Sequence, residues 1–447
     1  MATQIPTSFP TPAPILRKGV VVVTVSLLLL IPISMLRGLI SERIRLADQA
    51  EATVAAGWGG AQQVSGPILV IPVRHRIRDV RGQAQQQMGF VFVLPDTLNI
   101  NARLETESRR LGIYTVPVYQ SRLSITALFL PSDLAPLVRL VEGGQHVFWE
   151  QAQLLLPVSE VKGIRALEKA QWGDEGLRFV GGSYPQHNGV RAAIDLARLR
   201  DGDPASFGIE MTVAGSRMLQ FLPLARTTDV AVGADWAHPG FSGNYLPAER
   251  EINAAGFAAR WQILELNRDY PQSWIDEAVV SHEQLSKSAF GVRLHQPADI
   301  YQLNERSMKY ALLFVVMTFA SLFLLEHLAG PALHAVQYAL VGLALSIFFL
   351  LLLALSEHIG FDPAYWLGTA ALAALVGVYL GGALQSRVRG WGAAVAVLLL
   401  YSLLFVILNA AETALLIGAL SLFALLAAMM ILTRRVDWNS ISRETKI

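Results

Sequence analysis

Cysteine is absent from the sequence, which excludes disulfides, thiol nucleophiles, iron–sulfur clusters and thiolate zinc sites. Positive and negative charges are almost balanced. The chain has 36 Lys and Arg residues and 35 Asp and Glu residues, which gives a formal net charge of +1 at pH 7. Nucleic-acid-binding domains are commonly strongly basic. We therefore expect no nucleic-acid partner, and any folded domain must be stabilised by its own hydrophobic core.

Recognisable catalytic motifs are absent as well. The sequence has no Gly-x-Ser-x-Gly nucleophile motif, no His-Glu-x-x-His zinc motif and no glycine-rich phosphate-binding loop. His282 and Glu283 come closest to a metal motif, but no second histidine follows at helical spacing. The sequence therefore predicts no enzyme activity, no catalytic residue, no metal site and no cofactor.

Hydrophobic residues are abundant and make up 53% of the chain. They concentrate in long runs close to the roughly 20 residues that a helix needs to cross a bilayer. The runs are 20–36, 310–328, 336–355, 365–384, 393–409 and 413–432. Short connections join the last five runs, which predicts a bundle of antiparallel neighbouring helices.

The first apolar run is preceded by Arg17 and Lys18, as it would be in a signal peptide. A cleaved signal peptide is one interpretation, but no small-x-small cleavage site follows the run closely. Charged residues from Arg37 to Arg45 follow instead, and Leu39 and Ile40 extend the run. The flanks favour an uncleaved membrane anchor.

The distribution of Lys and Arg predicts the orientation in the membrane. The connection 385–392 and the stretch after residue 433 are basic, and the short connections 356–364 and 410–412 carry no Lys or Arg. Cytoplasmic loops carry the excess of positive charge. Both termini are therefore expected in the cytoplasm and the long polar segment in the periplasm. The protein is predicted to be a multi-pass protein of a bacterial inner membrane, with the lipid bilayer as a partner.

Five parts of the chain follow from these boundaries. They are a cytoplasmic tail 1–19, an anchor helix 20–40, a periplasmic β-rich domain 41–308 with an N-terminal helical stalk, a five-helix transmembrane bundle 309–432 and a cytoplasmic tail 433–447. The fold class is therefore a mixed membrane protein.

The periplasmic segment shows the alternation of polar and apolar residues that is typical of half-buried strands. It is clearest at 123–129, 230–236 and 257–263. Glycine and proline separate such stretches, for example at Gly66-Pro67 and Pro239-Gly240. We expect a mainly-β, sandwich-like domain. Helices are also expected within 132–143 and 274–287.

Three polar residues near the predicted membrane edges are candidate ligand-binding residues: Glu357, His358 and Glu412. A histidine beside a carboxylate can respond to protons near neutral pH. Polar residues at helix ends are also expected at a membrane interface for structural reasons alone. The spacing Gly377-x-x-x-Gly381 permits close helix packing, which we take as its use.

The segment 235–247 is dense in aromatic residues, proline and glycine. We expect a rigid loop of several turns. Its residues Trp236, His238 and Phe241 are candidates for binding a partner or ligand. The structural alternative is that the aromatic rings cover the end of the core. The alternation from Val230 to Trp236 favours that alternative, because it places the Trp236 ring on the apolar face.

Short motifs follow one another along the chain at 30–33, 41–43, 65–69, 71–72, 112–114, 235–239, 246–251, 256–261, 309–313, 337–343, 356–361 and 433–438. Together they resemble the CreD family of bacterial inner-membrane proteins over nearly the whole chain. Two positions depart from the family pattern. Gly240-Phe241 follows His238-Pro239, where the family usually has Ser-Phe, and Glu412 stands where the family more often has Asp.

The resemblance implies a role in cell-envelope integrity and in the response to envelope stress or β-lactams, under control of a two-component regulatory system. It implies no catalytic residues. We expect the β-domain to contact an unidentified envelope protein or polymer. The alternative is a transporter of small molecules or lipids through the five-helix bundle. No Asp, Glu, Lys or Arg lies near the middle of any predicted span, which favours the first hypothesis.

Overall fold

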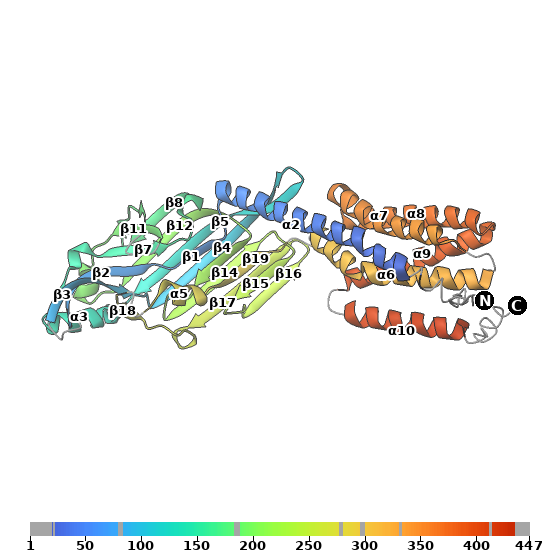
Figure 1. The fold of residues 1–447 in the computed structure, drawn as a ribbon. Helices are drawn as coiled ribbons and strands as arrows, with labels where there is room; N and C mark the ends of the chain where they lie inside the picture. The colour runs from blue at the N-terminus through green and yellow to red at the C-terminus, as the bar shows by residue number, and fades with distance from the viewer. Residues whose placement is uncertain are drawn as a thin grey trace, which may run out of the picture. The chain divides into compact units, whose positions relative to one another are not determined.

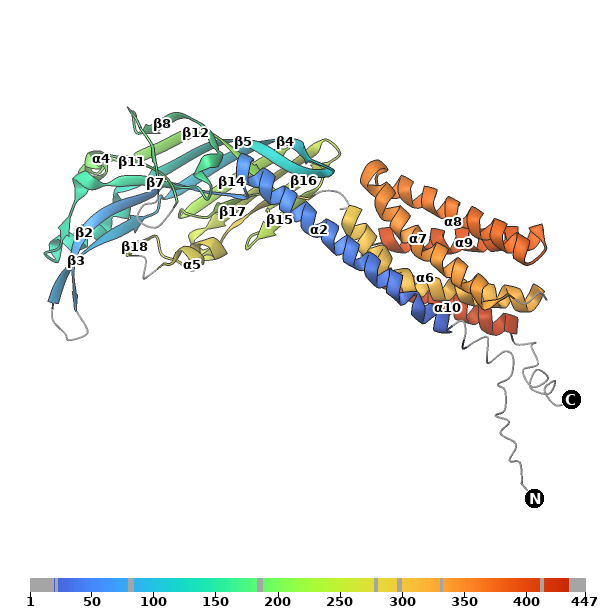
Figure 2. The same ribbon diagram turned by 45° about the horizontal axis from the view of Figure 1, so that its top comes forward.

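The computed structural model describes residues 20, 23–78, 84–182, 188–276, 280–295, 300–329, 333–410 and 414–433. The chain divides into two compact units. Met1–Leu46 and Ala298–Ile447 form a helical unit, and Ala47–Pro297 form a mainly-β unit. The helix α2 (Leu30–Trp58) is continuous across the first of these divisions (Figures 1 and 2). One helix thus runs from the predicted anchor into the predicted stalk, and the division of the chain at these bounds stays a prediction.

The helical unit contains the C-terminal helices at the predicted positions. They are α6 (Ile300–Ala329), α7 (Ala335–Ile359), α8 (Phe361–Ala383), α9 (Arg387–Asn409) and α10 (Ala414–Thr433). Each of the helices α6 to α9 contacts the next, and α9 also contacts α6, so these four surround a common interior. Helix α10 packs against α9.

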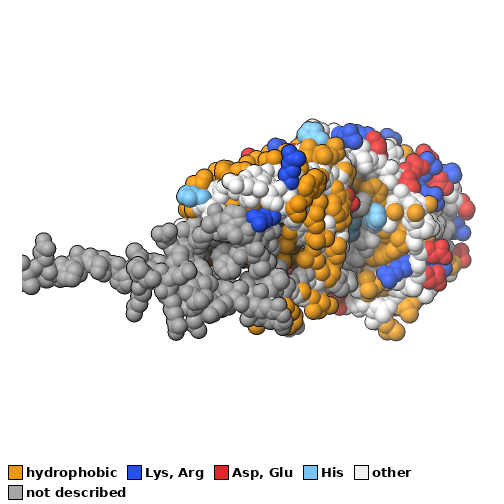
Figure 3. All heavy atoms as spheres, turned by 90° about the vertical axis from the view of Figure 1, so that its right-hand side faces the viewer, with side chains coloured by type: hydrophobic (Ala, Val, Ile, Leu, Met, Phe, Trp, Pro, Cys, Tyr) orange, Lys and Arg blue, Asp and Glu red, His pale blue; other side chains and the backbone are white. Residues whose placement is uncertain are grey.

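Four helices are long and apolar enough to cross a membrane in the part of the chain that the structure describes. They are the helix that begins at Val23, and α7, α8 and α9. The exposed residues of α7 and α8 include Leu340, Leu343 and Leu375, and hydrophobic side chains form broad bands in the space-filling view (Figure 3). An N-terminal apolar helix and apolar C-terminal helices are thus confirmed. The crossing by α6 and α10 stays a prediction.

Glycines allow α8 and α9 to approach closely. A Cβ atom on Gly390 would lie 2.5 Å from the carbonyl oxygen of Gly377 and 2.6 Å from the Cα of Gly381. Real Cβ atoms do not tolerate such distances from backbone, so only glycine fits at this crossing. The spacing of Gly377 and Gly381 therefore serves packing, as predicted.

In its described residues the β unit contains three sheets, of which the largest has eight strands. Its order is β16 (Glu249–Asn253), β17 (Gly256–Leu264), β14 (Thr227–Ala234), β4 (Thr97–Leu111), β5 (Tyr114–Phe129), β12 (Ala205–Ser216), β8 (Ile164–Trp172) and β9 (Glu175–Gly176). The neighbours are antiparallel except β14 and β4, which are parallel. Burial alternates residue by residue along β5, β14 and β17, which confirms the strands predicted from alternation.

The other two sheets have seven and four strands. The seven-stranded sheet has the order β10 (Val180–Gly181), β11 (Gly189–Ala193), β7 (Gln153–Pro157), β2 (Ile68–Arg78), β3 (Ala84–Val93) and β18 (Ser273–Ile275), with β6 (His146–Val147) paired to β2. The four-stranded sheet has the order β1 (Gln62–Ser65), β13 (Met218–Leu222), β19 (Phe290–Leu294) and β15 (Pro239–Gly243).

Two of the short helices lie where helices were expected. Helix α3 (Ala135–Glu142) occupies the first of the two predicted stretches. In the second stretch only α5 (His282–Lys287) is helical among the described residues, and its beginning belongs to the strand β18. A third short helix, α4 (Ala197–Asp201), precedes β12. The prediction for 274–287 was therefore wrong in its first residues, because Trp274 stacks on Phe92 of β3.

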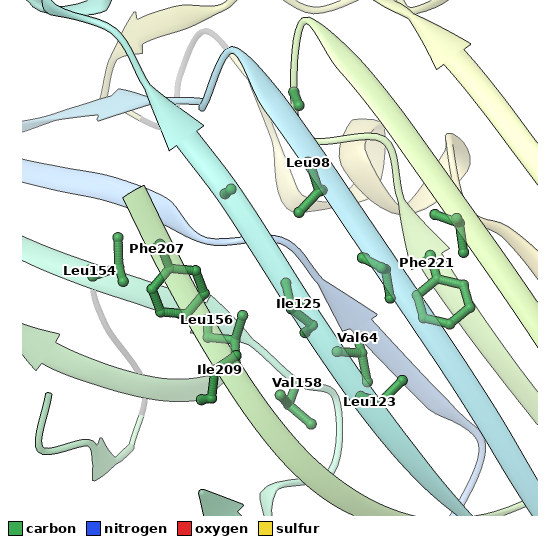
Figure 4. Packing of buried hydrophobic residues seen from close by; sticks show 14 of the residues in the cluster. Val64, Leu98, Leu123, Ile125, Leu154, Leu156, Val158, Phe207, Ile209 and Phe221 are labelled. Atoms are coloured by element: carbon green, nitrogen blue, oxygen red, sulfur yellow. The ribbon is translucent and has the colours of Figure 1, made fainter. Parts of the chain in front are cut away.

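One hydrophobic core draws side chains from all three sheets. In Figure 4, Ile125 and Phe207 of the eight-stranded sheet lie among Leu154 and Leu156 of β7 and Phe221 of β13. All five side chains are almost completely buried. Burial of apolar surface at roughly 25 cal/mol per Å² is the main stabilising term for such a core. A domain without cysteine can therefore be stable through packing alone.

Candidate functional site

The segment 235–247 does not form the predicted loop of several turns. Its centre is the strand β15, which pairs antiparallel with β19 from Pro239 opposite Leu294 to Gly243 opposite Phe290. Gly243 has a positive φ of 106° and lies against the backbone of Ala289, so a side chain would clash there. The loop prediction was wrong because the pairing partner lies far along the chain and leaves no local signal.

The aromatic side chains of this segment pack against the core of the β unit. Trp236 and Phe241 are half-buried on the core, and the Trp236 Nε1–H donates to the carbonyl oxygen of His295 at 2.9 Å. The Phe241 ring lies 5.8 Å from the ring of Trp261, edge to face. His238 is exposed. These contacts favour the structural alternative for Trp236 and Phe241, and a binding role for the three residues stays a prediction.

Glu357 lies at a polar junction of three helices in the helical unit. Its Oε1 lies 3.4 Å from Nε of Arg43 on α2 and accepts a hydrogen bond of 3.3 Å from the Tyr301 hydroxyl on α6. The Glu357 side chain is only 8% exposed, against 37% for Arg43. A carboxylate that is nearly removed from solvent needs such partners. Glu357 therefore connects both of the helices through which the chain passes between its units.

Further buried polar groups surround this polar junction. Asn304 Nδ2 donates to the Ser356 hydroxyl at 3.0 Å and to the carbonyl oxygen of Ile300 at 2.8 Å. The Ser307 hydroxyl donates to the carbonyl oxygen of Asn304. Sequence reasoning missed these residues. The spacing Tyr301-x-x-Asn304-x-x-Ser307, which places three polar side chains on one helix face, is the signal that could have found them.

The remaining candidates near the membrane edges do not join Glu357. His358 is exposed, and its Nδ1 lies 3.0 Å from the carbonyl oxygen of Ala354 on the same helix. Glu412 lies outside the described residues. Trp236, His238 and Phe241 belong to the other unit. Within the helical unit, the described candidates are therefore Glu357, held at the polar junction, and the exposed His358.

A second polar site, which sequence reasoning also missed, is a cavity of about 300 Å³ in the β unit, hereafter the β-unit cleft. Its lining residues are Gln63, Ser65, Ile68, Pro157, Val158, Ser159, Asn188, Leu222, Leu224 and Leu285. The Ser65 side chain is 1% exposed, and its hydroxyl has no hydrogen-bond partner in the described part of the chain. A buried hydroxyl without a partner costs about 1–3 kcal/mol. The cleft thus offers an unsatisfied buried hydroxyl beside apolar walls and three further polar residues, Gln63, Ser159 and Asn188.

The motif that contains Ser65 has a structural explanation at its next residue. A Cβ atom on Gly66 would collide with the side chain of Leu98 on β4. Glycine therefore lets the chain leave β1 close to the eight-stranded sheet. The motif Ser65-Gly66-Pro67 therefore marks a close approach of the backbone to β4, and it gives no signal of the cleft.

Charged groups elsewhere in the β unit form a structural network. Arg226 donates to Asp96 at 2.9 Å, to Glu265 at 3.0 Å and to Asp133 at 3.3 Å. Burial raises the pKa of the Asp133 carboxyl, although the backbone N–H of Leu130 and the Arg226 guanidinium favour its charged form. Among the described residues no group of three or more His, Asp and Glu side chains could hold a metal ion.

Comparison with known proteins matches almost the whole chain. The family model described as "Inner membrane protein CreD" matches residues 14–439. A curated relative from Escherichia coli (strain K12), named "Inner membrane protein CreD", is 32% identical over 427 residues. The alignment covers 93% of this chain and 92% of that relative. Neither description names a catalytic activity.

Proposed function

Because the chain belongs to the CreD family of inner membrane proteins, we propose that it supports the integrity of the cell envelope by binding an envelope partner through its β unit. The family places the chain in the inner membrane as a multi-pass protein, in agreement with its apolar helices. The proposed mode of action is non-catalytic: the β unit contacts an envelope protein or polymer.

The β-unit cleft is the observation that carries this proposal. A volume of about 300 Å³ is at the lower end of the range for ligand-binding sites. Leu222, Leu224 and Ile68 supply apolar walls, and the Ser65 hydroxyl can donate or accept one hydrogen bond. A segment of a partner that is mostly apolar and carries one polar group would satisfy Ser65. Binding would then relieve part of the desolvation cost of that hydroxyl.

We further propose that the β unit is a periplasmic sandwich and that both termini are cytoplasmic. The common core of the three sheets supports a layered arrangement. The basic residues Arg387 and Arg389 at the start of α9 support a cytoplasmic α8–α9 connection. Six crossings then follow from the anchor and the helices α6 to α10.

Transport through the helical bundle is the second candidate. Its support is the buried polar cluster of Asn304, Ser307 and Ser356 at one end of α6 and α7. A transport pathway requires polar groups along the span. The cavity between α6 and α9 has a volume of about 30 Å³, space for about one water molecule. A larger cavity of about 260 Å³ between α7 and α8 is lined by apolar residues and one glycine and supplies no polar path. The β-unit cleft therefore carries more weight.

A blocked cleft tests the proposed function. The replacement Gln63→Trp places a large ring at the half-exposed edge of the cleft. In a deletion strain, this variant should reach normal abundance in the membrane but fail to restore envelope permeability and detergent resistance under envelope stress. The matched control is Gln262→Trp, at an exposed position of β17. Full complementation by Gln63→Trp would contradict the proposal.

A further inference from the structure

A cavity of about 320 Å³ lies between α2 and α6 within the helical unit. Its lining residues are Arg37, Ile40, Ser41, Glu305, Met308 and Lys309. Ile40 and Met308 are almost completely buried and form an apolar floor. The cavity, which we call the headgroup pocket, is distinct from the polar junction at Glu357 and from the β-unit cleft.

Two cations stand at the wall of the headgroup pocket. The Arg37 Nη2 donates to the carbonyl oxygen of Met308 at 3.1 Å, which fixes the guanidinium against α6. A guanidinium has five N–H groups, and this bond uses one of them. The Lys309 Nζ lies 3.1 Å from Glu305 Oε1, one turn earlier on the same helix. With two cations and one carboxylate, the lining carries a net charge of +1, complementary to a monoanion.

The position of these cations relates the headgroup pocket to the bilayer. Arg37 directly follows the first apolar run, 20–36, and Lys309 directly precedes the second, 310–328. The end of the first run and the start of the second therefore lie at the same cavity, although the two helices are far apart in sequence. If both runs cross the membrane as proposed, the cavity lies at the level of the lipid phosphates.

We propose that the headgroup pocket binds the headgroup of an anionic glycerophospholipid such as phosphatidylglycerol. The phosphate diester contacts Arg37 and Lys309, and the glycerol hydroxyls donate to Glu305. The acyl chains extend from the pocket along the apolar runs 20–36 and 310–328. Free phosphate has the same anionic chemistry but no acyl chain, so the adjoining apolar runs distinguish the lipid from the free ion. The inference rests on the proposed membrane crossings and is independent of the β-unit cleft.

The test uses the full chain in an uncharged detergent. Thermal unfolding is followed while phosphatidylglycerol is added, and native mass spectrometry counts the lipids retained. The variant Arg37→Gln/Lys309→Gln removes both cations from the headgroup pocket. The matched control Arg306→Gln/Arg387→Gln removes two cations near apolar runs that do not line it.

Phosphatidylglycerol should stabilise the unchanged protein and the control alike. In the headgroup-pocket variant, the lipid concentration for half of the stabilisation should rise about tenfold or more, since each cation contributes to the attraction of an anionic headgroup. If that variant does not fold, Lys309→Gln alone should raise the lipid concentration for half of the stabilisation severalfold. Its side chain is exposed, so folding should survive.

Three results would overturn the proposal. The first is an equal loss of lipid affinity in the headgroup-pocket variant and in the control. The second is equal stabilisation by phosphatidylethanolamine, which would remove the anionic specificity. The third is equal stabilisation by inorganic phosphate at the same concentration, which would show that the pocket takes the free anion and no lipid.

Discussion

Trp236 and His238 are neighbours in sequence and differ in surroundings. The Trp236 ring packs on the core and its Nε1–H is bonded to His295, whereas His238 is exposed and contributes its backbone carbonyl to the hydrogen bond from the His295 N–H. The sequence predicted the side on which Trp236 lies, because strand alternation continues into it. It could not predict that β15 follows, because the β15–β19 pairing is long-range.

Replacement of Trp236 by Ala tests its structural role. Large-to-small changes of fully buried aromatic residues cost about 3–5 kcal/mol. Trp236 is half-buried, so a loss of about 1–3 kcal/mol in the free energy of unfolding is expected, with lower abundance in the membrane. His238→Ala should change the stability by about 0.5 kcal/mol or less. Denaturant unfolding of both variants measures this. An unchanged stability of Trp236→Ala together with lost function would favour the binding role.

Replacement of Glu357 tests the contribution of the polar junction to stability. Glu357→Gln retains an acceptor for the Tyr301 hydroxyl but removes the charge opposite Arg43. Because Arg43 is more than a third exposed, solvent screens the pair and a loss of about 1 kcal/mol is expected. Thermal unfolding in detergent without added lipid measures this change in stability. A double-mutant cycle with Arg43→Gln should show coupling between the two residues, and strictly additive effects would contradict the contact.

The helices and the alternating strands were the elements most accessible from sequence. Apolar runs predict spanning helices because a bilayer requires an uninterrupted apolar length. Alternation predicts strands such as β14 and β17 because one face of each is buried. The cleft beside Ser65 and the polar junction at Glu357 were not predicted. Their residues come from segments far apart in sequence and meet only after the chain has folded, so a local pattern such as Tyr301-x-x-Asn304-x-x-Ser307 can mark one wall of a site but not the site itself.

The α8–α9 crossing is a test at the scale of elements. Gly390→Ala should destabilise the helical unit by about 1–3 kcal/mol, because the added methyl group meets the backbone of Gly377 and Gly381. Gly392→Ala on the same helix has open space around its Cβ position. It should leave the stability unchanged or raise it by about 0.5–1 kcal/mol, through helix propensity. Equal effects of both replacements, measured by thermal unfolding, would disprove the close crossing.

At the scale of the whole molecule, two units are joined by α2 and by the start of α6. Arg43 and Tyr301 lie on these two connections, and both contact Glu357. The Arg217 side chain in turn forms ion pairs with Asp48 and Glu51 of α2 inside the β unit. Each end of the stalk is therefore tied to its own unit by charged contacts.

The location of the β unit outside the cytoplasm is the claim on which the proposed envelope role depends. Because the chain has no cysteine, a single introduced cysteine can be labelled without background. Gln262→Cys in β17 and Arg387→Cys at the start of α9 are treated, in intact spheroplasts, with a maleimide that cannot cross the membrane. The account predicts labelling of Gln262→Cys in intact spheroplasts and of Arg387→Cys only after lysis. Labelling of Gln262→Cys only after lysis would contradict it.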